Sequence, residues 1–163
     1  MNMIPNRSGL RHRARGITMV ESLVALVILS VGMLGIAGLY VTGIKAGRSA
    51  LLRTQAVNLA SDMADRIRAN RRAITAYDMD AYGGAPTDQS CIGNDCTSAE
   101  LAEDDLFRWQ AAIEAALPGR PLALADVQVV NEAAPAADRY AISVTWHEAG
   151  ETAASTYTLM VEQ

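Results

Sequence analysis

The sequence predicts an α+β fold in which a long N-terminal α-helix packs on a small antiparallel β-sheet. An uncharged apolar run over residues 22–44 continues as an amphipathic helical pattern to about residue 73, with no proline from residue 17 to residue 85. Near the C-terminus, apolar and polar residues alternate along residues 140–147 and 156–161, which is typical of strands. One face of such a sheet needs cover, and the amphipathic part of the long helix can supply it.

Charge is distributed unevenly along the 163 residues, whose net charge is −4. Residues 1–16 hold four arginines and no acid, so 10 basic and 18 acidic residues remain from Ile17 onward, a net charge of −8. This acidic part has no evident attraction for nucleic acid. His12 and His147 lie far apart, the chain has only two cysteines, and no metal site is expected. We see no nucleophile–base pair or phosphate loop and expect no enzyme activity and no cofactor.

Residues 1–16 form a short basic leader, MNMIPNRSGLRHRARG. An arginine-rich segment before an apolar run stays on the cytoplasmic side, and the remainder of the chain is translocated. In an ordinary secretory signal the small-residue cleavage site follows the apolar region, whereas here the small residue, Gly16, precedes it.

The apolar run that follows is long enough to cross a membrane. From Ser22 to Ile44 there are 23 uncharged residues, and about 20 suffice for a helix to span the hydrocarbon core. Glu21 stands at the start of this run, where a carboxylate costs about 2.5–3.5 kcal/mol on insertion scales and needs a partner. The glycines of residues 32–38, spaced three apart, indicate either close helix packing or a locally weak helix.

The helix is expected to continue beyond the membrane, for about 55 residues in all. Its second half has an apolar stripe and a polar face. The stripe consists of Leu52, Ala56, Leu59, Ala60, Met63 and Ile67. On the polar face, Asp62 and Arg66 have i,i+4 spacing and Asp65 and Arg68 have i,i+3 spacing, which predicts two ion pairs.

Residues 76–97 are expected to form a loop, because glycine, proline and aspartate recur there. Cys91 and Cys96 lie in it and, once exported to an oxidising compartment, can form a structural disulfide. A redox pair is the less favoured reading, since the spacing is not C-x-x-C. The scattered aspartates lack the regular spacing of a calcium loop.

A second helix and three strands complete the predicted fold. Thr97 and Glu100 form a capping-box pattern that starts the helix, and a Pro-Gly pair at residues 118–119 ends it. We expect Trp109 in the core on this helix's apolar face, with Leu106, Ile113 and Leu117. The strands are expected at residues 127–130, 140–147 and 156–161, with His147 on the solvent face near a strand end.

The basic leader, the apolar run and the acidic residue stand in a specific order, reading GITMVE over residues 16–21. This resembles the class III leader of type IV pilins and pseudopilins, with Ile17 in place of the usual Phe and Met19 in place of the usual Leu. The resemblance implies cleavage after Gly16 by a prepilin peptidase and N-methylation of the new amino group on Ile17. It also gives Glu21 a role, namely pairing with the N-terminal amine of a neighbouring subunit during assembly. The alternative is a glutamate tolerated near the membrane interface.

A second resemblance covers the following segment. The block DMADRIRAN, residues 62–70, is similar to the minor pilins of the type IV pilus modification protein (PilV) group, which typically have Met in place of Ile67. Trp109, the Leu-Pro-Gly turn at 117–119 and Trp146 also look like that group. The charged residues of the block are candidate contacts to neighbouring subunits, or alternatively a solvated helix face with local ion pairs. They are Asp62, Asp65, Arg66 and Arg68.

Together these features predict a type IV pilin-like protein made of a leader (1–16), a transmembrane and assembly helix (17–45) and a periplasmic domain (46–163). The resemblance implies a minor pilin that helps to initiate pilus assembly, supports twitching motility and enters the pilus, near its tip. Its implied partners are other minor pilins, the major pilin, the prepilin peptidase and the inner-membrane assembly machinery. It would lie in the inner membrane before assembly and in the pilus afterwards. The alternatives are a type II secretion pseudopilin and a single-pass anchored periplasmic binding protein.

Overall fold

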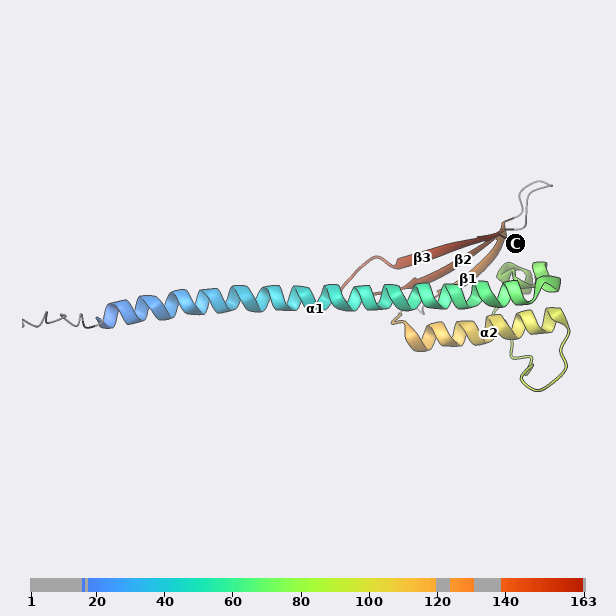
Figure 1. Ribbon diagram of the computed structural model, residues 1–163, viewed down its shortest axis with the longest axis horizontal. Coiled ribbons are helices and arrows are strands. Elements are labelled where there is room, and N and C mark those ends of the chain that lie inside the picture. The colour runs from blue at the N-terminus through green and yellow to red at the C-terminus, as the bar shows by residue number, and fades with distance from the viewer. Residues whose placement is uncertain (1–15, 17, 120–123, 131–138, 163) are drawn as a thin grey trace, which may run out of the picture. The chain divides into compact units, whose positions relative to one another are not determined.

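The computed structural model describes residue 16 and residues 18–119, 124–130 and 139–162 (Figure 1). The chain divides into two compact units, residues 1–44 and residues 45–163. Along the chain, a long helix is followed by two short 3₁₀ helices, a second α-helix and three strands. This is the predicted α+β architecture, a long N-terminal helix packed on a three-stranded antiparallel sheet.

The long helix, α1, runs from Met19 to Ala69, 51 residues without a break. It ends about four residues earlier than the apolar pattern predicts. Asn70 leaves the helical conformation, with φ −109° and ψ 54°, and its side-chain amide donates to the carbonyl of Ser98, 2.7 Å away. A contact with a distant part of the chain therefore sets the end of α1.

Two 3₁₀ helices follow, η1 (Arg71–Tyr77) and η2 (Met79–Tyr82). They occupy the start of the segment that the sequence predicts to be a loop, so that prediction is wrong for residues 76–82. Asp78 caps η2 by accepting from the backbone N–H of Asp80 at 3.0 Å. Gly83 ends η2 in the left-handed region, at φ 60°, where glycine is favoured.

The second α-helix, α2, spans Ser98–Ala116 and begins with the predicted capping box. Thr97 Oγ1 accepts from the Glu100 N–H at 3.3 Å, and the Glu100 carboxylate accepts from the Thr97 N–H at 2.8 Å. These two bonds satisfy backbone donors that the first helical turn leaves free. Leu117 follows as the last residue of the buried face, before Pro118.

The sheet consists of β1 (Leu124–Val130), β2 (Arg139–Trp146) and β3 (Ser155–Glu162), antiparallel in the order β1-β2-β3. The first strand begins three residues earlier than predicted. Along β2 the expected alternation is complete, with Tyr140, Ile142, Val144 and Trp146 buried. His147 follows β2 and is half-exposed, in alternation with the buried residues of the strand, although its Nδ1 is buried and has no hydrogen-bond partner in the described chain.

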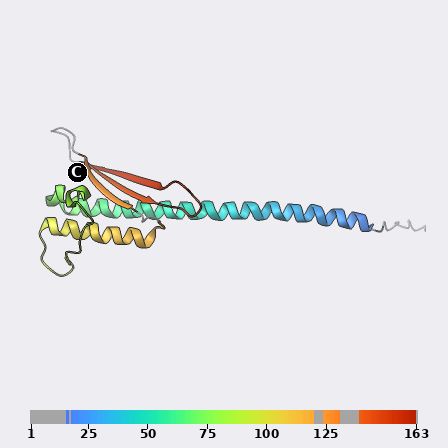
Figure 2. The ribbon, with the colours of Figure 1, turned by 180° about the vertical axis from the view of Figure 1, so that it is seen from behind.

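One core joins the second half of α1, α2 and the inner face of the sheet. α1 runs beside α2, and the three strands follow the same stretch of α1 (Figure 2). The core is largely aliphatic and rich in alanine, as the composition predicts. Its helical members are Leu52, Ala56, Ala60, Met63, Ala64, Ile67, Ala102, Leu106, Trp109 and Ile113. Because five of the six residues of the predicted α1 stripe are buried, the amphipathic pattern correctly identified the packing face.

Candidate functional site

The start of α1 is the first part of the candidate site. The N–H of Glu21 donates to Thr18 Oγ1 at 3.2 Å, so Thr18 caps the helix that begins at Met19. Gly16 is exposed, and Ile17, the predicted methylated residue, lies outside the described residues. The cap was not predicted, although Thr18 and Glu21 have the same T-x-x-E spacing that identified the cap of α2.

Glu21 is exposed in the first turn of α1. Its carboxylate has no hydrogen bond or ion pair to any residue of the described chain. The partial positive charge of a helix N-terminus favours an acid there, by about 0.3–1 kcal/mol. That is less than the insertion cost of about 2.5–3.5 kcal/mol for a carboxylate at the centre of a membrane helix. The helix N-terminus therefore offsets only part of such a cost, and a cationic partner for Glu21 in another molecule remains a prediction.

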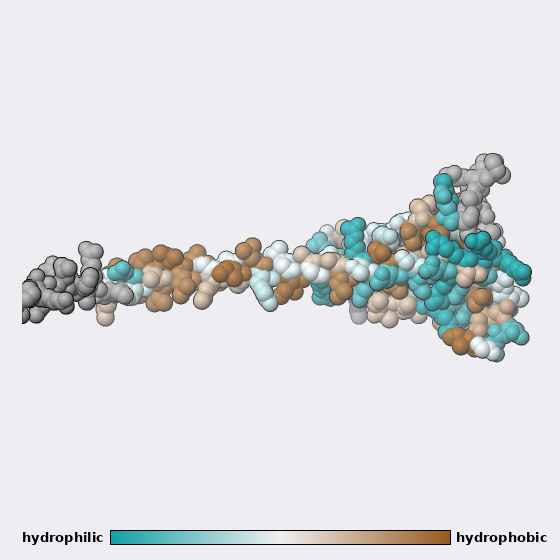
Figure 3. All heavy atoms as spheres, viewed as in Figure 1, coloured by the Kyte–Doolittle hydropathy of each residue, from teal (hydrophilic) through white to brown (hydrophobic). Residues whose placement is uncertain are grey.

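The side chains in the apolar half of α1 are exposed, and on the face seen in Figure 3 most of them are hydrophobic. Its most apolar 18-residue window has a mean hydropathy of 2.4 and no buried residue. The hydroxyls within this half are satisfied by the helix itself, since Ser30 donates to the carbonyls of Leu26 and Val27, and Thr42 donates to that of Gly38. By length and composition this helix can cross a membrane.

The glycines of this half are not required by packing within the chain. A Cβ atom placed on Gly32, Gly35 or Gly38 would meet no other atom within 4 Å. Both explanations that the sequence offers for these glycines, close packing against other helices and local weakness, therefore remain predictions.

The charged block at residues 62–70 forms both predicted ion pairs. Arg66 Nε lies 2.9 Å from Asp62 Oδ2, and Arg68 Nη1 lies 3.0 Å from Asp65 Oδ1. Arg66 makes a further pair across the domain, with Nη1 2.8 Å from Asp105 Oδ1 on α2. Arg66 thus links the two helices, while Asp62, Asp65 and Arg68 are exposed. Within the chain, these contacts are the local ion pairs of the second interpretation. A contact between these charges and neighbouring subunits remains a prediction.

Tyr77 is a core residue that the sequence did not identify. It is fully buried in η1, and its hydroxyl donates to Asp105 Oδ2 at 2.8 Å. Burial raises the pKa of Tyr77 well above its usual value near 10, so the hydroxyl stays protonated and remains a donor. Asp105 therefore accepts from both Arg66 and Tyr77 and joins α1, η1 and α2 at one point.

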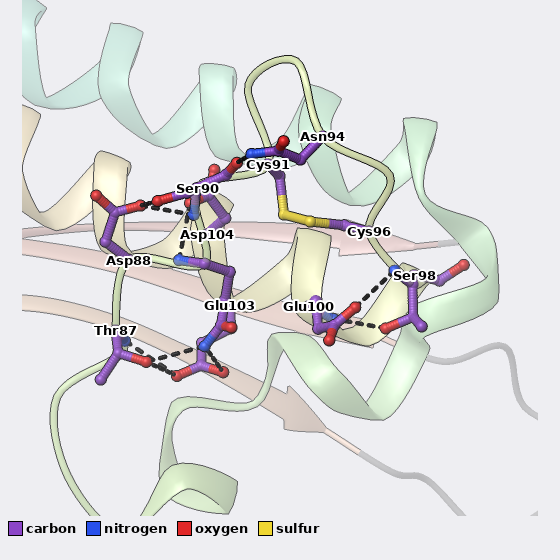
Figure 4. The surroundings of a disulfide bond; sticks show 12 residues. Thr87, Asp88, Ser90, Cys91, Asn94, Cys96, Ser98, Glu100, Glu103 and Asp104 are labelled. Carbon is purple, nitrogen blue, oxygen red and sulfur yellow. Dashed lines mark hydrogen bonds between the residues drawn. A yellow bond between two sulfur atoms is a disulfide. The ribbon is translucent and has the colours of Figure 1, made fainter.

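The predicted disulfide between Cys91 and Cys96 is present (Figure 4). The loop before it is held on α2 by carboxylates. Thr87 donates through both its N–H and its hydroxyl to Glu103 Oε1, at 3.0 and 2.7 Å. The N–H of Gln89 donates to Asp104 Oδ1 at 3.1 Å.

Asp104 is the one charged residue buried in the described chain, with 2% of its surface exposed. Arg108 Nε lies 2.6 Å from Asp104 Oδ2, and this hydrogen bond holds the pKa of Asp104 below its usual range. A paired and hydrogen-bonded carboxylate can be buried without a large penalty. The i,i+4 spacing of Asp104 and Arg108 was visible in the sequence, but the partner loop was not.

Three aspartates approach one another where η2 meets β1. The pKa of Asp126 is raised, first by burial and then by the charges of Asp80 and Asp78. Within the described residues, however, no group of three potential ligands lies close enough to hold a metal ion.

Two family models match the chain. The Tt1218-like family, described as type IV pilin Tt1218, matches residues 38–107. The prokaryotic N-terminal methylation motif matches residues 11–37, which include the leader junction and Glu21. No curated protein and no solved structure shows a significant match.

The methylation motif and the hydrophobic helix are consistent with a location in the inner membrane and afterwards in the pilus. The match to type IV pilins implies pilus subunits as neighbours and processing by a prepilin peptidase. Because the two matches adjoin, residues 11–107 are similar to type IV pilins, which are structural proteins and not enzymes, and carry the class III methylation signal.

Proposed function

We propose that this chain is a minor pilin, similar to the PilV group, that helps to initiate pilus assembly and is incorporated near the pilus tip. In this proposal, a prepilin peptidase cleaves after Gly16, and the new amino group of Ile17 is methylated. The observation that carries the proposal is the exposure of the apolar half of α1, from Ser22 to Ile44. So much apolar surface needs cover, first from lipid and then from the helices of other subunits.

Glu21 favours the move of the apolar helix from the lipid into the pilus. In the pilus its carboxylate pairs with the amine of Ile17 of a neighbouring subunit, a partner that the lipid does not offer. The exposed charges of Asp62, Asp65 and Arg68 then lie available for contacts with neighbouring minor pilins. Arg66 supports that surface indirectly, through its ion pair with Asp105.

A type II secretion pseudopilin is the nearest alternative, since it shares the leader, the helix and the glutamate. The match of residues 38–107 to a type IV pilin model favours the pilus. An anchored periplasmic binding protein is the second alternative, and it predicts that residues 1–16 stay attached to the membrane-extracted chain.

Deletion of the gene tests the proposed role. We expect surface pili and twitching motility to fall at least about tenfold, because initiation needs every member of a priming complex, and expression of the wild-type chain should restore both. Pili counted by electron microscopy give the result. Normal piliation with a loss of protein secretion would instead identify a pseudopilin.

Replacing Gly16 with leucine is expected to block processing, because the bulky side chain occupies the residue just before the scissile bond. The intact mass of the membrane-extracted chain should then include residues 1–16. The wild-type chain should lack them and carry one added methyl group. Exposed Gly47 offers a matched control, since Gly47→Leu adds the same side chain on α1 and should leave processing unchanged. Normal cleavage of Gly16→Leu would remove the leader assignment.

A further inference from the structure

The outer edge of β3 is open. β3 is the last strand of the sheet, and it pairs with β2 along all eight residues from Ser155 to Glu162. Every second residue of an edge strand directs its N–H and C=O groups away from the neighbouring strand. In the described part of the chain no backbone group pairs with this edge. At about 3.4 Å per residue, the edge offers roughly 27 Å of unpaired backbone.

β3 also lacks the features by which proteins usually protect an edge. From Ser155 to Val161 it contains no charged residue, proline or glycine, and its only charge, Glu162, is terminal. The opposite edge differs, because β1 carries Asp126 and is contacted by η1 and η2. An uncharged and unobstructed edge of this length is a template for strand pairing.

At the same edge, the apolar side of the sheet is only partly covered. On β2 the inward residues Tyr140, Ile142 and Val144 are fully buried. On β3 their counterparts Tyr157 and Leu159 remain half-exposed, although each lies directly beside a buried β2 residue. A further strand with apolar residues facing inward would cover both side chains and continue the core.

The outward-facing side chains of β3 determine which side chains fit on the outward face of an added strand. Thr156 and Thr158 form hydroxyl hydrogen bonds with Thr145 and Ser143, each 2.9 Å long. Met160 follows them and is 53% exposed. No charge stands on this face of β3 before Glu162, so an uncharged polar side chain fits beside it, whereas a charged one finds no partner.

A second copy of the chain fits this edge poorly. Antiparallel pairing of β3 with its own copy would make the second halves of α1, which pack on the two sheets, run in opposite directions. Two copies inserted by the same basic leader must, however, cross the membrane in the same direction. Parallel pairing of the same two edges would turn one sheet over. The polar Thr156 and Thr158 of the copy would then lie beside Tyr157 and Leu159 and leave them uncovered.

We propose that the outer edge of β3 accepts an extended segment of a different polypeptide, which adds a fourth strand to the sheet. The segment alternates aliphatic residues, placed over Tyr157 and Leu159, with uncharged polar residues placed beside Thr156 and Thr158. Backbone hydrogen bonds supply the attachment, and the alternation sets the register. This acceptor edge does not depend on the proposed role in initiation.

Hydrogen exchange on the full-length chain in detergent micelles tests the proposal. The probe is a peptide of four Val-Thr repeats with blocked ends and a C-terminal lysine pair for solubility. Saturating peptide is expected to slow exchange in residues 155–161 by about tenfold, while the rate in residues 139–146 stays unchanged. A peptide with proline in place of each valine loses half of its backbone donors and cannot form a regular strand ladder, so it should give no protection.

A pair of variants separates edge binding from a general effect of charge. Thr158→Lys and Ser143→Lys remove the same hydroxyl hydrogen bond and add the same charge to the same face, but only Thr158 is on the edge strand. We expect Thr158→Lys to weaken peptide binding by about tenfold and Ser143→Lys by less than about twofold, because edge lysines block strand addition. Thr156→Lys and Thr145→Lys repeat the comparison if the first pair disturbs folding.

Three results would overturn the proposal. They are the absence of protection by the peptide, an equal effect of the two lysine variants, and protection of residues 155–161 that rises with the concentration of the chain alone. The last result would identify a second copy as the occupant of the edge.

Discussion

Replacing Glu21 with alanine is expected to leave processing intact and to reduce incorporation of the chain into pili by at least about tenfold. In the proposed assembly the carboxylate pairs with the N-terminal amine of a neighbouring subunit in a medium of low dielectric. Breaking a buried pair by removing one partner costs about 3–5 kcal/mol, because the other charge is left uncompensated. The ratio of chain in sheared pili to chain in membranes, measured by immunoblot, gives the result.

Two variants sharpen this experiment. Glu21→Gln keeps the size of the side chain and removes the charge, so it should fail as Glu21→Ala does if pairing is the cause. Ser22→Ala changes the next residue and removes only a 3.4 Å hydrogen bond to the Thr18 carbonyl, so it should be incorporated normally. Equal incorporation of Glu21→Ala and the wild-type chain would contradict the pairing argument and favour a glutamate tolerated near the membrane interface.

The features that the sequence predicted well share a physical origin. Helical and alternating periodicity reports which face of an element is buried, and so it identified the α1 stripe, Trp109 and the inward residues of β2. The capping box at Thr97 and the pairing of Cys91 with Cys96 depend on residues three and five apart. Local spacing was therefore enough to identify these features. Only the structure shows which elements pack against each buried face.

The features that the sequence missed depend on distant partners. Tyr77 lies in a segment rich in loop formers, but it is buried because Asp105, 28 residues later, accepts its hydroxyl. Asp104 resembles any acid in an early helical turn, and only the Gln89 N–H and the Arg108 side chain make its burial possible. The end of α1 at Ala69 similarly follows from the contact of Asn70 with Ser98. No periodic pattern encodes such contacts.

What the sequence can predict about the candidate site is limited for a different reason. The sequence predicts the leader junction and a role for Glu21. The structure adds the cap at Thr18 and the absence of a partner for the Glu21 carboxylate within the described chain. When the partner of a charged residue belongs to another molecule, a single chain shows only that the charge stands in an unfavourable apolar environment. The acidic charge of Glu21 at the start of an apolar helix is the basis for predicting such a partner.

Replacing Trp109 with alanine is expected to destabilise the domain of residues 45–163 by about 3–5 kcal/mol. Trp109 is 1% exposed, and its Nε1 donates to the Leu59 carbonyl at 2.8 Å, so the change leaves a large cavity between α2 and α1 and removes a hydrogen bond. Domains of this size have a free energy of unfolding of about 5–15 kcal/mol. Scanning calorimetry of the full-length chain in detergent should show Tm lower by roughly 10–25 °C.

The same helix offers matched controls. Phe107 is two residues away and 36% exposed, so Phe107→Ala should cost less than about 1 kcal/mol. Trp109→Phe keeps most of the buried ring and loses the hydrogen bond to Leu59, which is worth about 0.5–1.5 kcal/mol. Similar Tm values for Trp109→Ala and Phe107→Ala would contradict the assignment of Trp109 to the core between α2 and α1. The predicted order, Trp109→Ala well below Trp109→Phe and Phe107→Ala in Tm, would show that packing between α2 and α1 stabilises the domain of residues 45–163.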